Sequence, residues 1–189
     1  MTDSDDDSAH AMADDSGLGL ARGTVELVSH NPAWYDAYER EVDRLRPRLG
    51  PNVLGFEHVG STAVPGLAAK PIVDMLVLVA DLGETGEVAR VLADAGYEER
   101  LNDEVPDRRF FAHGPPSRRT HYLSVTERGS DCHREQVVFR DALRSNPDLA
   151  AEYEQKKRAL ADAHPDDRES YTDAKAKFVQ SVLDDCDLD

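Results

Sequence analysis

The segment that most constrains the fold is an apolar run from Pro71 to Val79, in which Asp74 is the one charged residue. A run of this kind is typical of a central strand that is covered on both faces of a sheet. A buried carboxylate without a partner costs several kcal/mol, so we expect Asp74 to face a cleft, a cation or hydrogen-bond donors. Val53 to Val59 predicts another strand shortly before it.

The remaining pattern predicts alternating strands and helices, with helices at the end of the chain. Asn31 can cap a helix, Pro32 suits a first helical position, and apolar residues then recur at helical spacing to about Leu49. The other expected elements are a helix at 84–95 that Gly96 ends, short strands at 97–101, 108–113 and 121–126, and three helices from Asp131 onward. We therefore expect one α/β (α+β) domain, a mixed β-sheet flanked by helices with a C-terminal helical segment.

Composition limits the domain count and the class of partner. The chain has 189 residues, which suits a single domain, and a net charge of -16. Residues 1–22 are acidic and poor in large apolar groups, so we expect a disordered tail there and a folded domain over 23–185. A surface with this much negative charge disfavours binding to bulk nucleic acid and to anionic membranes, and it is typical of a halophilic protein.

The same composition bears on location. The start of the chain lacks the positive and apolar regions of a signal peptide, and no apolar run is long enough to span a membrane. Cys132 and Cys186 lack metal or disulfide spacing and indicate free thiols in a reducing compartment. We expect a cytoplasmic protein.

A Gly-Ser turn precedes the apolar strand and is the first candidate for a binding function. The hydroxyls of Ser61 and Thr62, with the backbone amides after Gly60, could hold a phosphate, and Lys70 could add a charge. The structural alternative is that Gly60 and Ser61 form only a tight turn and that Lys70 is solvated.

Val59-Gly60-Ser61, followed after twelve residues by Asp74, resembles the signature of the nucleotidyltransferase superfamily. In that pattern the strand carries two alternate carboxylates that together hold magnesium, but position 76 here is Leu, which offers no ligand. The resemblance implies a divalent metal cofactor, magnesium or manganese.

Other side chains could replace the missing acid. Glu57, His58 and His121 are candidate metal ligands beside Asp74, and a mixed His and carboxylate set would suit manganese, zinc or iron better than magnesium. His121 could also act as a catalytic base. For both histidines, a hydrogen-bonded structural role is the alternative.

The whole segment from Glu57 to Asp74 resembles the hallmark sequence of the GrpB family, which is nucleotidyltransferase-like. The likeness extends over about residues 24–183 and takes in Asn31-Pro32-Ala33-Trp34, Arg119 to Val125, Tyr153, Lys156-Lys157, Tyr171 and Lys175. It implies a nucleotidyltransferase fold without a settled reaction, a hydrophobic residue at position 76, and relatives fused to dephospho-coenzyme A kinase. Fold transfers between relatives better than function does.

Four of the five lysines lie in the closing helices. If these helices fold back over the sheet, Lys157 and Lys175 could reach a ligand phosphate while a Tyr stacks on a base. The alternative is that these lysines balance nearby acids at helical spacing. Arg108, Arg109, Arg118 and Arg119 form a second basic candidate, although pairing with acids in the same loop explains them as well.

Together these patterns predict a protein that binds a nucleotide, or another phosphorylated small molecule such as a coenzyme A-related compound, around Ser61, Lys70, Asp74 and His121. The first hypothesis is a metal-dependent nucleotidyltransferase with Asp74 and His121 as catalytic residues. The competing hypothesis is a noncatalytic ligand-binding module that lost the second acid at Leu76. A third, a structural partner protein, predicts no response to nucleotides.

Overall fold

The computed structural model describes residues 16–101, 105–165 and 167–186. Its centre is one five-stranded sheet with the order β1-β2-β5-β4-β3. The strands are β1 (Val53–Val59), β2 (Val73–Val79), β3 (Tyr97–Glu99), β4 (Arg108–His113) and β5 (His121–Glu127). β2 and β5 are parallel, whereas the other neighbours are antiparallel. The sheet is therefore mixed, with the apolar strand β2 between two neighbours, as its sequence predicts.

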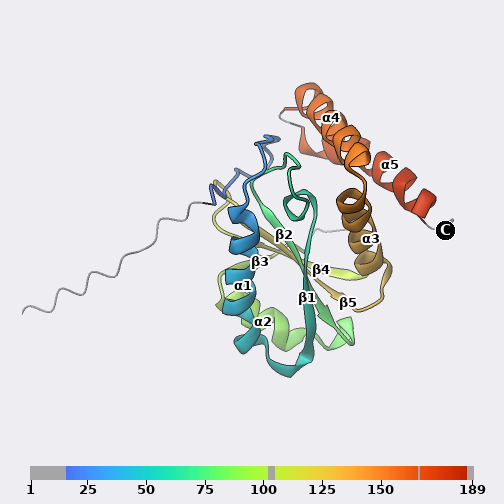
Figure 1. Ribbon diagram of the computed structural model, residues 1–189. Coiled ribbons are helices and arrows are strands. Elements are labelled where there is room, and N and C mark those ends of the chain that lie inside the picture. Colours follow the sequence, from blue (N-terminus) through green and yellow to red (C-terminus); the bar gives the residue numbers. More distant parts are fainter. Residues whose placement is uncertain (1–15, 102–104, 166, 187–189) are drawn as a thin grey trace, which may run out of the picture.

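Helices cover both faces of this sheet (Figure 1). The helices are α1 (Ala33–Leu49), α2 (Gly86–Asp94), α3 (Asp131–Ser145), α4 (Pro147–Ala163) and α5 (Arg168–Cys186). The main core packs α1 and α2 against one face of the sheet. On the other face, Val137 of α3 packs against a cluster that contains Leu76. The expected mixed sheet flanked by helices, with a C-terminal helical segment, is confirmed.

The alternation of side chains along β2 determines where Asp74 lies. Val73, Met75 and Val77 belong to the core that α1 and α2 cover. Because successive side chains of a strand point to opposite faces, Asp74 and Leu76 share the face that α3 covers. β2 thus has one completely apolar face and one face that carries a single carboxylate.

Caps and turns explain several element boundaries. Asn31 Oδ1 accepts a hydrogen bond from the amide of Ala33 (3.0 Å), as expected of a cap, and Asn146 Oδ1 accepts one from the amide of Leu149 (3.1 Å) at the start of α4. Gly96 follows α2 with a φ of 88°, which suits the end of a helix. Short 3-10 helices occur at Gly50–Asn52 (η1), Ser61–Ala63 (η2) and Leu82–Glu84 (η3).

The first described residues pack on the domain rather than forming part of a tail. Leu18 and Leu20 are buried, and Leu20 forms a β-bridge with Arg119. The indole Nε1 of Trp34 donates to the backbone oxygen of Ser16 (3.0 Å). The expected tail boundary at residue 22 is therefore too late, because apolar side chains at 18 and 20 reach the core. Residues 1–15 of the expected tail lie outside the described residues.

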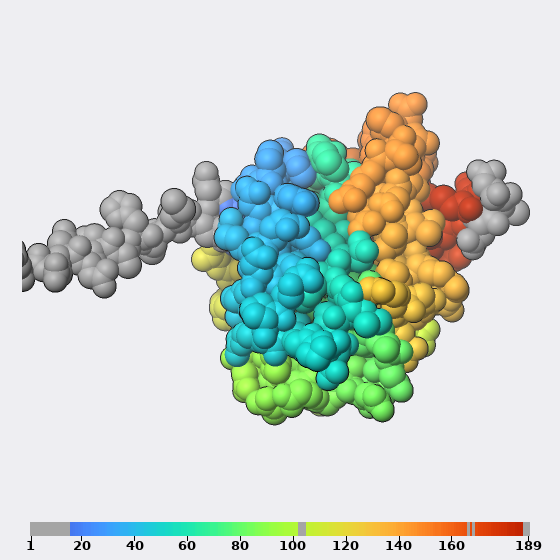
Figure 2. Space-filling model, turned by 60° about the horizontal axis from the view of Figure 1, so that its bottom comes forward, coloured from blue at the N-terminus to red at the C-terminus, as the bar shows by residue number. Residues whose placement is uncertain are grey.

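Segments that are distant in the sequence lie next to one another on one outer face of the molecule. Figure 2 shows α1, the segment around the end of β1, and the α3–α4 region side by side on this face.

Within the described residues, no helix has the length and apolar character that a membrane crossing requires. The two cysteines are free thiols, as expected, Cys132 buried and Cys186 exposed.

Candidate functional site

A pocket of about 300 Å³ lies where the turn after β1, strand β2 and the last three helices meet. It contains most of the residues that the sequence singles out for phosphate binding. Its lining is Leu27, Gly60, Ser61, Thr62, Ala69, Lys70, Asp74, Glu135, Gln136, Phe139, Tyr153, Lys157, Tyr171, Lys175 and Val179. We call it the lysine pocket. The closing helices do fold back over the sheet, because α3, α4 and α5 all contribute to this lining.

Gly60 holds the turn against the carboxylate of Asp74. Its φ is 71°, a left-handed conformation that favours glycine. A Cβ atom at this position would lie 2.8 Å from Asp74 Oδ2. The turn therefore requires glycine for its backbone conformation and for the close approach to Asp74.

The 3-10 turn that follows offers few backbone donors. The amides of Ala63 and Val64 donate to the oxygens of Gly60 and Ser61 (both 3.2 Å). The amides of Ser61 and Thr62 come before the first bond of this turn, so they are outside its own hydrogen bonds. A phosphate would have these two amides and the nearby side chains as donors.

Asp74 is half-buried and lines the pocket, whereas Leu76 on the same face is completely buried. Leu76 packs with Val59 and Leu78, and Val137 of α3 covers them. An acid at position 76 would thus lie in an apolar cluster rather than at the pocket. The second carboxylate of the nucleotidyltransferase pattern is absent, and hydrophobic packing occupies its place.

Lys157 of α4 is the most unusual charged residue of the pocket, because it is only 2% exposed. Its Nζ donates to Ser61 Oγ (3.0 Å) and to the backbone oxygen of Ala68, and lies 4.9 Å from the centroid of the Tyr153 ring. Burial, followed by repulsion from Lys175, lowers the pKa of Lys157 to about 7. Lys157 therefore links the turn after β1 to α4 with a charge that its surroundings disfavour.

Two further lysines of this pocket lie near the same tyrosine ring. The Nζ atoms of Lys70 and Lys175 are 4.3 and 6.0 Å from the centroid of the Tyr171 ring, within the range of cation–π contacts. Tyr171 is buried, and burial raises its pKa to about 12. Three of the chain's five lysines thus gather in one small pocket of a protein whose net charge is -16.

The structure does not bring the four expected metal ligands together. His58 pairs with Met75 and His121 pairs with Val73, so both histidines lie on the face opposite Asp74. Glu57 lies on the Asp74 face but binds Arg140 of α3 (2.7 Å) and does not line the pocket. Across the described ranges, no group of three or more His, Cys, Asp or Glu side chains is placed to hold a metal.

The two histidines have structural neighbours on their own face. His58 Nε2 is 3.0 Å from Thr62 Oγ1, and its ring stacks on Tyr38 at a centroid distance of 4.7 Å. Burial and the nearby Arg144 lower the pKa of His58 to about 3, so His58 is neutral at physiological pH. His121 contacts Thr120 and the ring of His113, across the sheet from the lysine pocket. The pairing of Asp74 with His121 in one catalytic site is a prediction that this geometry does not support.

The second basic candidate is occupied within the fold. Arg109 and Arg119 pair with Glu99 and Glu98, and Arg118 donates to the backbone oxygen of Leu18. Arg109, Arg118 and Arg119 therefore connect strands and the N-terminal segment, and residues 102–104 of the loop lie outside the described residues.

Sequence reasoning missed the contribution of α3 to the pocket. Glu135, Gln136 and Phe139 line it, and Glu135 supplies a second carboxylate to the lining. Cys132, Gln136 and Phe139 follow one another at intervals of four and three residues, so they share one face of the helix. That periodicity was available in the sequence, but it does not show which face meets Asp74.

The fold and the pocket define an α+β protein with a lysine-rich pocket beside a single strand carboxylate. The sequence model of the family described as GrpB protein matches residues 24–185. This chain therefore belongs to the GrpB family, as its resemblance implied.

Relatives and a solved structure agree with this assignment. The glutamate-rich protein GrpB of Alkalihalophilus pseudofirmus is 35% identical over 172 residues, which cover 89% of this chain and 99% of that protein. UPF0157 protein YqkA of Bacillus subtilis is 32% identical over 84% of this chain, which spans only 46% of its length. The crystal structure of conserved protein GrpB from Enterococcus faecalis is 34% identical, with a TM-score of 0.75 over 85% of this chain and 98% of that one.

Two more distant similarities concern proteins with named activities. A dephospho-CoA kinase of Mycolicibacterium paratuberculosis is 31% identical over 86% of this chain, which covers 46% of that protein. The Cid1 poly(U) polymerase structure with MgGTP bound has a TM-score of 0.47 at 15% identity, over 71% of this chain and 44% of that one. A similarity of that size does not establish a shared activity.

Proposed function

We propose that this protein binds a phosphorylated small molecule, with a nucleotide or a coenzyme A-related compound as the first candidates, in the lysine pocket. The observation that carries the proposal is that Lys70, Lys157 and Lys175 line one pocket together with the turn of Ser61 in a strongly anionic chain. A polyphosphate is the ligand that three ammonium groups and two amides of a turn suit best.

Lys157 gives the clearest reason to expect an anion. Its Nζ is desolvated and donates hydrogen bonds to neutral oxygens of Ser61 and Ala68. A phosphate oxygen near this ammonium would supply the missing negative charge and would favour the protonated form. Binding would therefore be accompanied by proton uptake near pH 7.

The carboxylates that line the pocket are better placed to hold a divalent metal, magnesium or manganese, than the four ligands that the sequence predicts. Asp74 and Glu135 are the two carboxylates among the described lining residues, and protein sites for Mg²⁺ commonly use one or two carboxylates together with phosphate oxygens of the ligand. When bound, such a metal would neutralise charge on the phosphate. The residues of this chain would position the phosphate and exclude water.

Two functions are compatible with such a site. In a nucleotidyltransferase, Asp74 would hold the metal while Lys157 and the Ser61 turn position the phosphate tail for transfer. In a noncatalytic binding module, the lysines would suffice and the metal would add little. The packing of Leu76 in an apolar cluster favours the second function, because the strand then carries one acid in place of two.

Thermal-shift titration with nucleotides and coenzyme A, each with and without magnesium or manganese, tests the proposal. A ligand at 100 times its Kd stabilises the native state by about 2.7 kcal/mol, which is readily measured. We expect a shift that Lys157→Met and Lys175→Met reduce and that Lys156→Met, an exposed neighbour on α4, leaves unchanged. If none of these compounds shifts the transition, the proposal is wrong.

The metal distinguishes the two functions. If binding improves with metal and Asp74→Asn removes that improvement, the transferase hypothesis is supported. If affinity is the same with and without metal and Asp74→Asn leaves it unchanged, the binding-module hypothesis is supported instead.

A further inference from the structure

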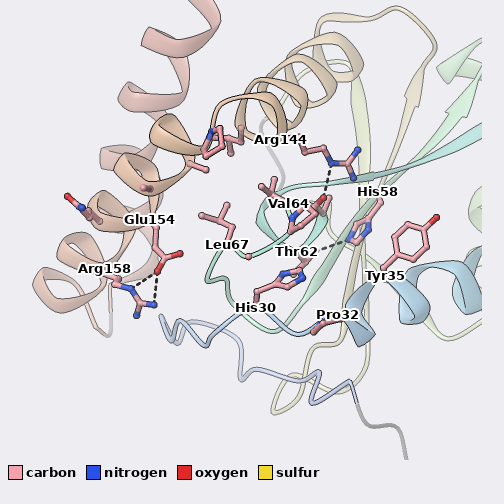
Figure 3. A pocket seen from close by; sticks show the side chains of 18 residues that line it. His30, Pro32, Tyr35, His58, Thr62, Val64, Leu67, Arg144, Glu154 and Arg158 are labelled. Atoms are coloured by element: carbon pink, nitrogen blue, oxygen red, sulfur yellow. Dashed lines mark hydrogen bonds and ion pairs between the residues drawn. The ribbon is translucent and has the colours of Figure 1, made fainter.

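A second and larger cavity, of about 1060 Å³, lies on the other side of the loop that follows β1. Figure 3 shows this cavity, which is surrounded by the segment before α1, the loop, the end of α3 and the N-terminal part of α4, from Pro147 to Arg158. Thr62 lines both cavities, but the lysines do not reach this one. Its volume is in the range of pockets that hold drug-sized small molecules.

The wall of this cavity is mainly apolar. Val64, Leu67 and Leu143 form its floor, and Pro147 and Ala151 lie at its helical side. Val64, Leu67 and Leu143 are each at most 3% exposed, because they also belong to the core between the loop and the closing helices. These three side chains therefore fix the shape of the wall, whereas the apolar surface open to a ligand comes from the exposed lining residues Pro65, Pro147 and Ala151.

Charges are confined to the ends of the cavity, as Figure 3 shows. At one end, Glu154 pairs with Arg158 (2.9 Å), which neutralises both. At the other end lies Arg144, with Tyr35 and the neutral His58 beside it. Among the described residues of the lining, Arg144 is thus the guanidinium that no lining carboxylate neutralises.

Arg144 is held in place but incompletely paired. Its Nε donates to the backbone oxygen of Ala63 (2.9 Å), which fixes the guanidinium against the loop. Within the part of the chain that the structure describes, its nearest ion pair is to Asp141 at 3.7 Å, beyond hydrogen-bond distance. Asp141 instead accepts two hydrogen bonds from Arg140, at 2.7 and 3.1 Å.

We propose that this cavity binds a small-molecule carboxylate with an apolar body, the carboxylate on the terminal nitrogens of Arg144 and the body on the exposed apolar side chains of Pro65, Pro147 and Ala151. A planar guanidinium matches a carboxylate in two parallel hydrogen bonds. One cation balances one negative charge, whereas a phosphate dianion suits the three lysines of the other pocket better. This site is independent of the function proposed for the lysine pocket.

Calorimetric titration with octanoate at about 0.15 M salt, where long-range repulsion by the acidic surface is screened, tests this proposal. We expect saturable binding at one site, weaker binding of the neutral octanol, and a loss of about ten- to a hundredfold in octanoate affinity in Arg144→Gln, as for the loss of a charged hydrogen bond. The matched control is Arg134→Gln, which changes an exposed arginine of the same helix away from the cavity.

A second variant tests the location. Ala151→Phe fills the cavity from an exposed position of α4 and should abolish octanoate binding without reducing the response to triphosphate. The single tryptophan, Trp34, contacts the cavity residue His30 at a ring distance of 5.4 Å, so its fluorescence reports occupancy. Failure of octanoate to saturate the wild-type protein, or equal affinity in Arg144→Gln, would overturn the proposal.

Discussion

Replacing Lys157 by Met should change how stability depends on pH. In the native protein, burial lowers the pKa of Lys157 from 10.5 to about 7, whereas an unfolded chain exposes the amine to water. Between these two values the unfolded state binds the proton and the native state does not. Stability must therefore rise with pH across this window, from about 7 to 10.5, and this contribution disappears in Lys157→Met.

The magnitude follows from the shift. Each pKa unit corresponds to about 1.4 kcal/mol, so the whole shift is worth roughly 5 kcal/mol, most of it relieved by pH 10. The Lys157 side chain is only 2% exposed, so solvent does not screen its charge and this free energy is not reduced for screening. We expect the unfolding free energy of the wild type, relative to that of Lys157→Met, to rise by roughly 3 to 4 kcal/mol from pH 7 to pH 10.

Urea unfolding at several pH values, followed by circular dichroism at constant salt, gives this difference directly. Other groups that titrate in this window are present in both proteins, so their contributions largely cancel. Lys156→Met is the control, because Lys156 is an exposed lysine of the same helix. If the curves of the wild type and Lys157→Met run parallel from pH 7 to 10, Lys157 is not a desolvated amine and the description of the pocket is wrong.

Three further variants test separate features of the site. Gly60→Ala should destabilise the protein by about 1 to 3 kcal/mol in urea unfolding, because it combines a left-handed φ with a Cβ 2.8 Å from Asp74 Oδ2; a neutral effect would contradict the close approach. Leu76→Asp restores the two-acid pattern but places a carboxylate in an apolar cluster, so it should lower the free energy of unfolding by about 3 to 5 kcal/mol and create no metal site. A stable variant that binds magnesium would refute this. His121→Gln should leave triphosphate affinity within twofold in calorimetry, since His121 faces away from the pocket, and a large loss would contradict that placement.

The sequence predicts the sheet well because its signals are local. The apolar run with Asp74 and the Gly60 turn are determined by backbone conformation and burial, and the structure places them as expected. β2 begins at Val73 rather than Pro71, because the first ladder bond from β2 to its neighbour is the Val73 amide to Thr120. Proline has no amide to donate there.

The grouping of site residues depends on distant contacts, and the sequence predicts it only in part. The sequence predicts that Lys157 and Lys175 reach a phosphate if the closing helices fold back, and they do lie in the pocket with Ser61. The sequence also places the histidines on strands that neighbour the strand of Asp74, but it does not show which face each side chain occupies. Pairing in register places His58 opposite Met75 and His121 beside Val73, which turns both away from Asp74.

The most direct test of the central claim is calorimetric titration of inorganic triphosphate, which presents the phosphate chemistry without a base. We expect one saturable site in the wild type whose affinity falls as the pH rises above 7, a loss of at least about tenfold in Lys157→Met, and no change in Lys156→Met. Equal affinity in all three proteins, or no binding to the wild type, would contradict the claim that the lysine pocket is a phosphate site.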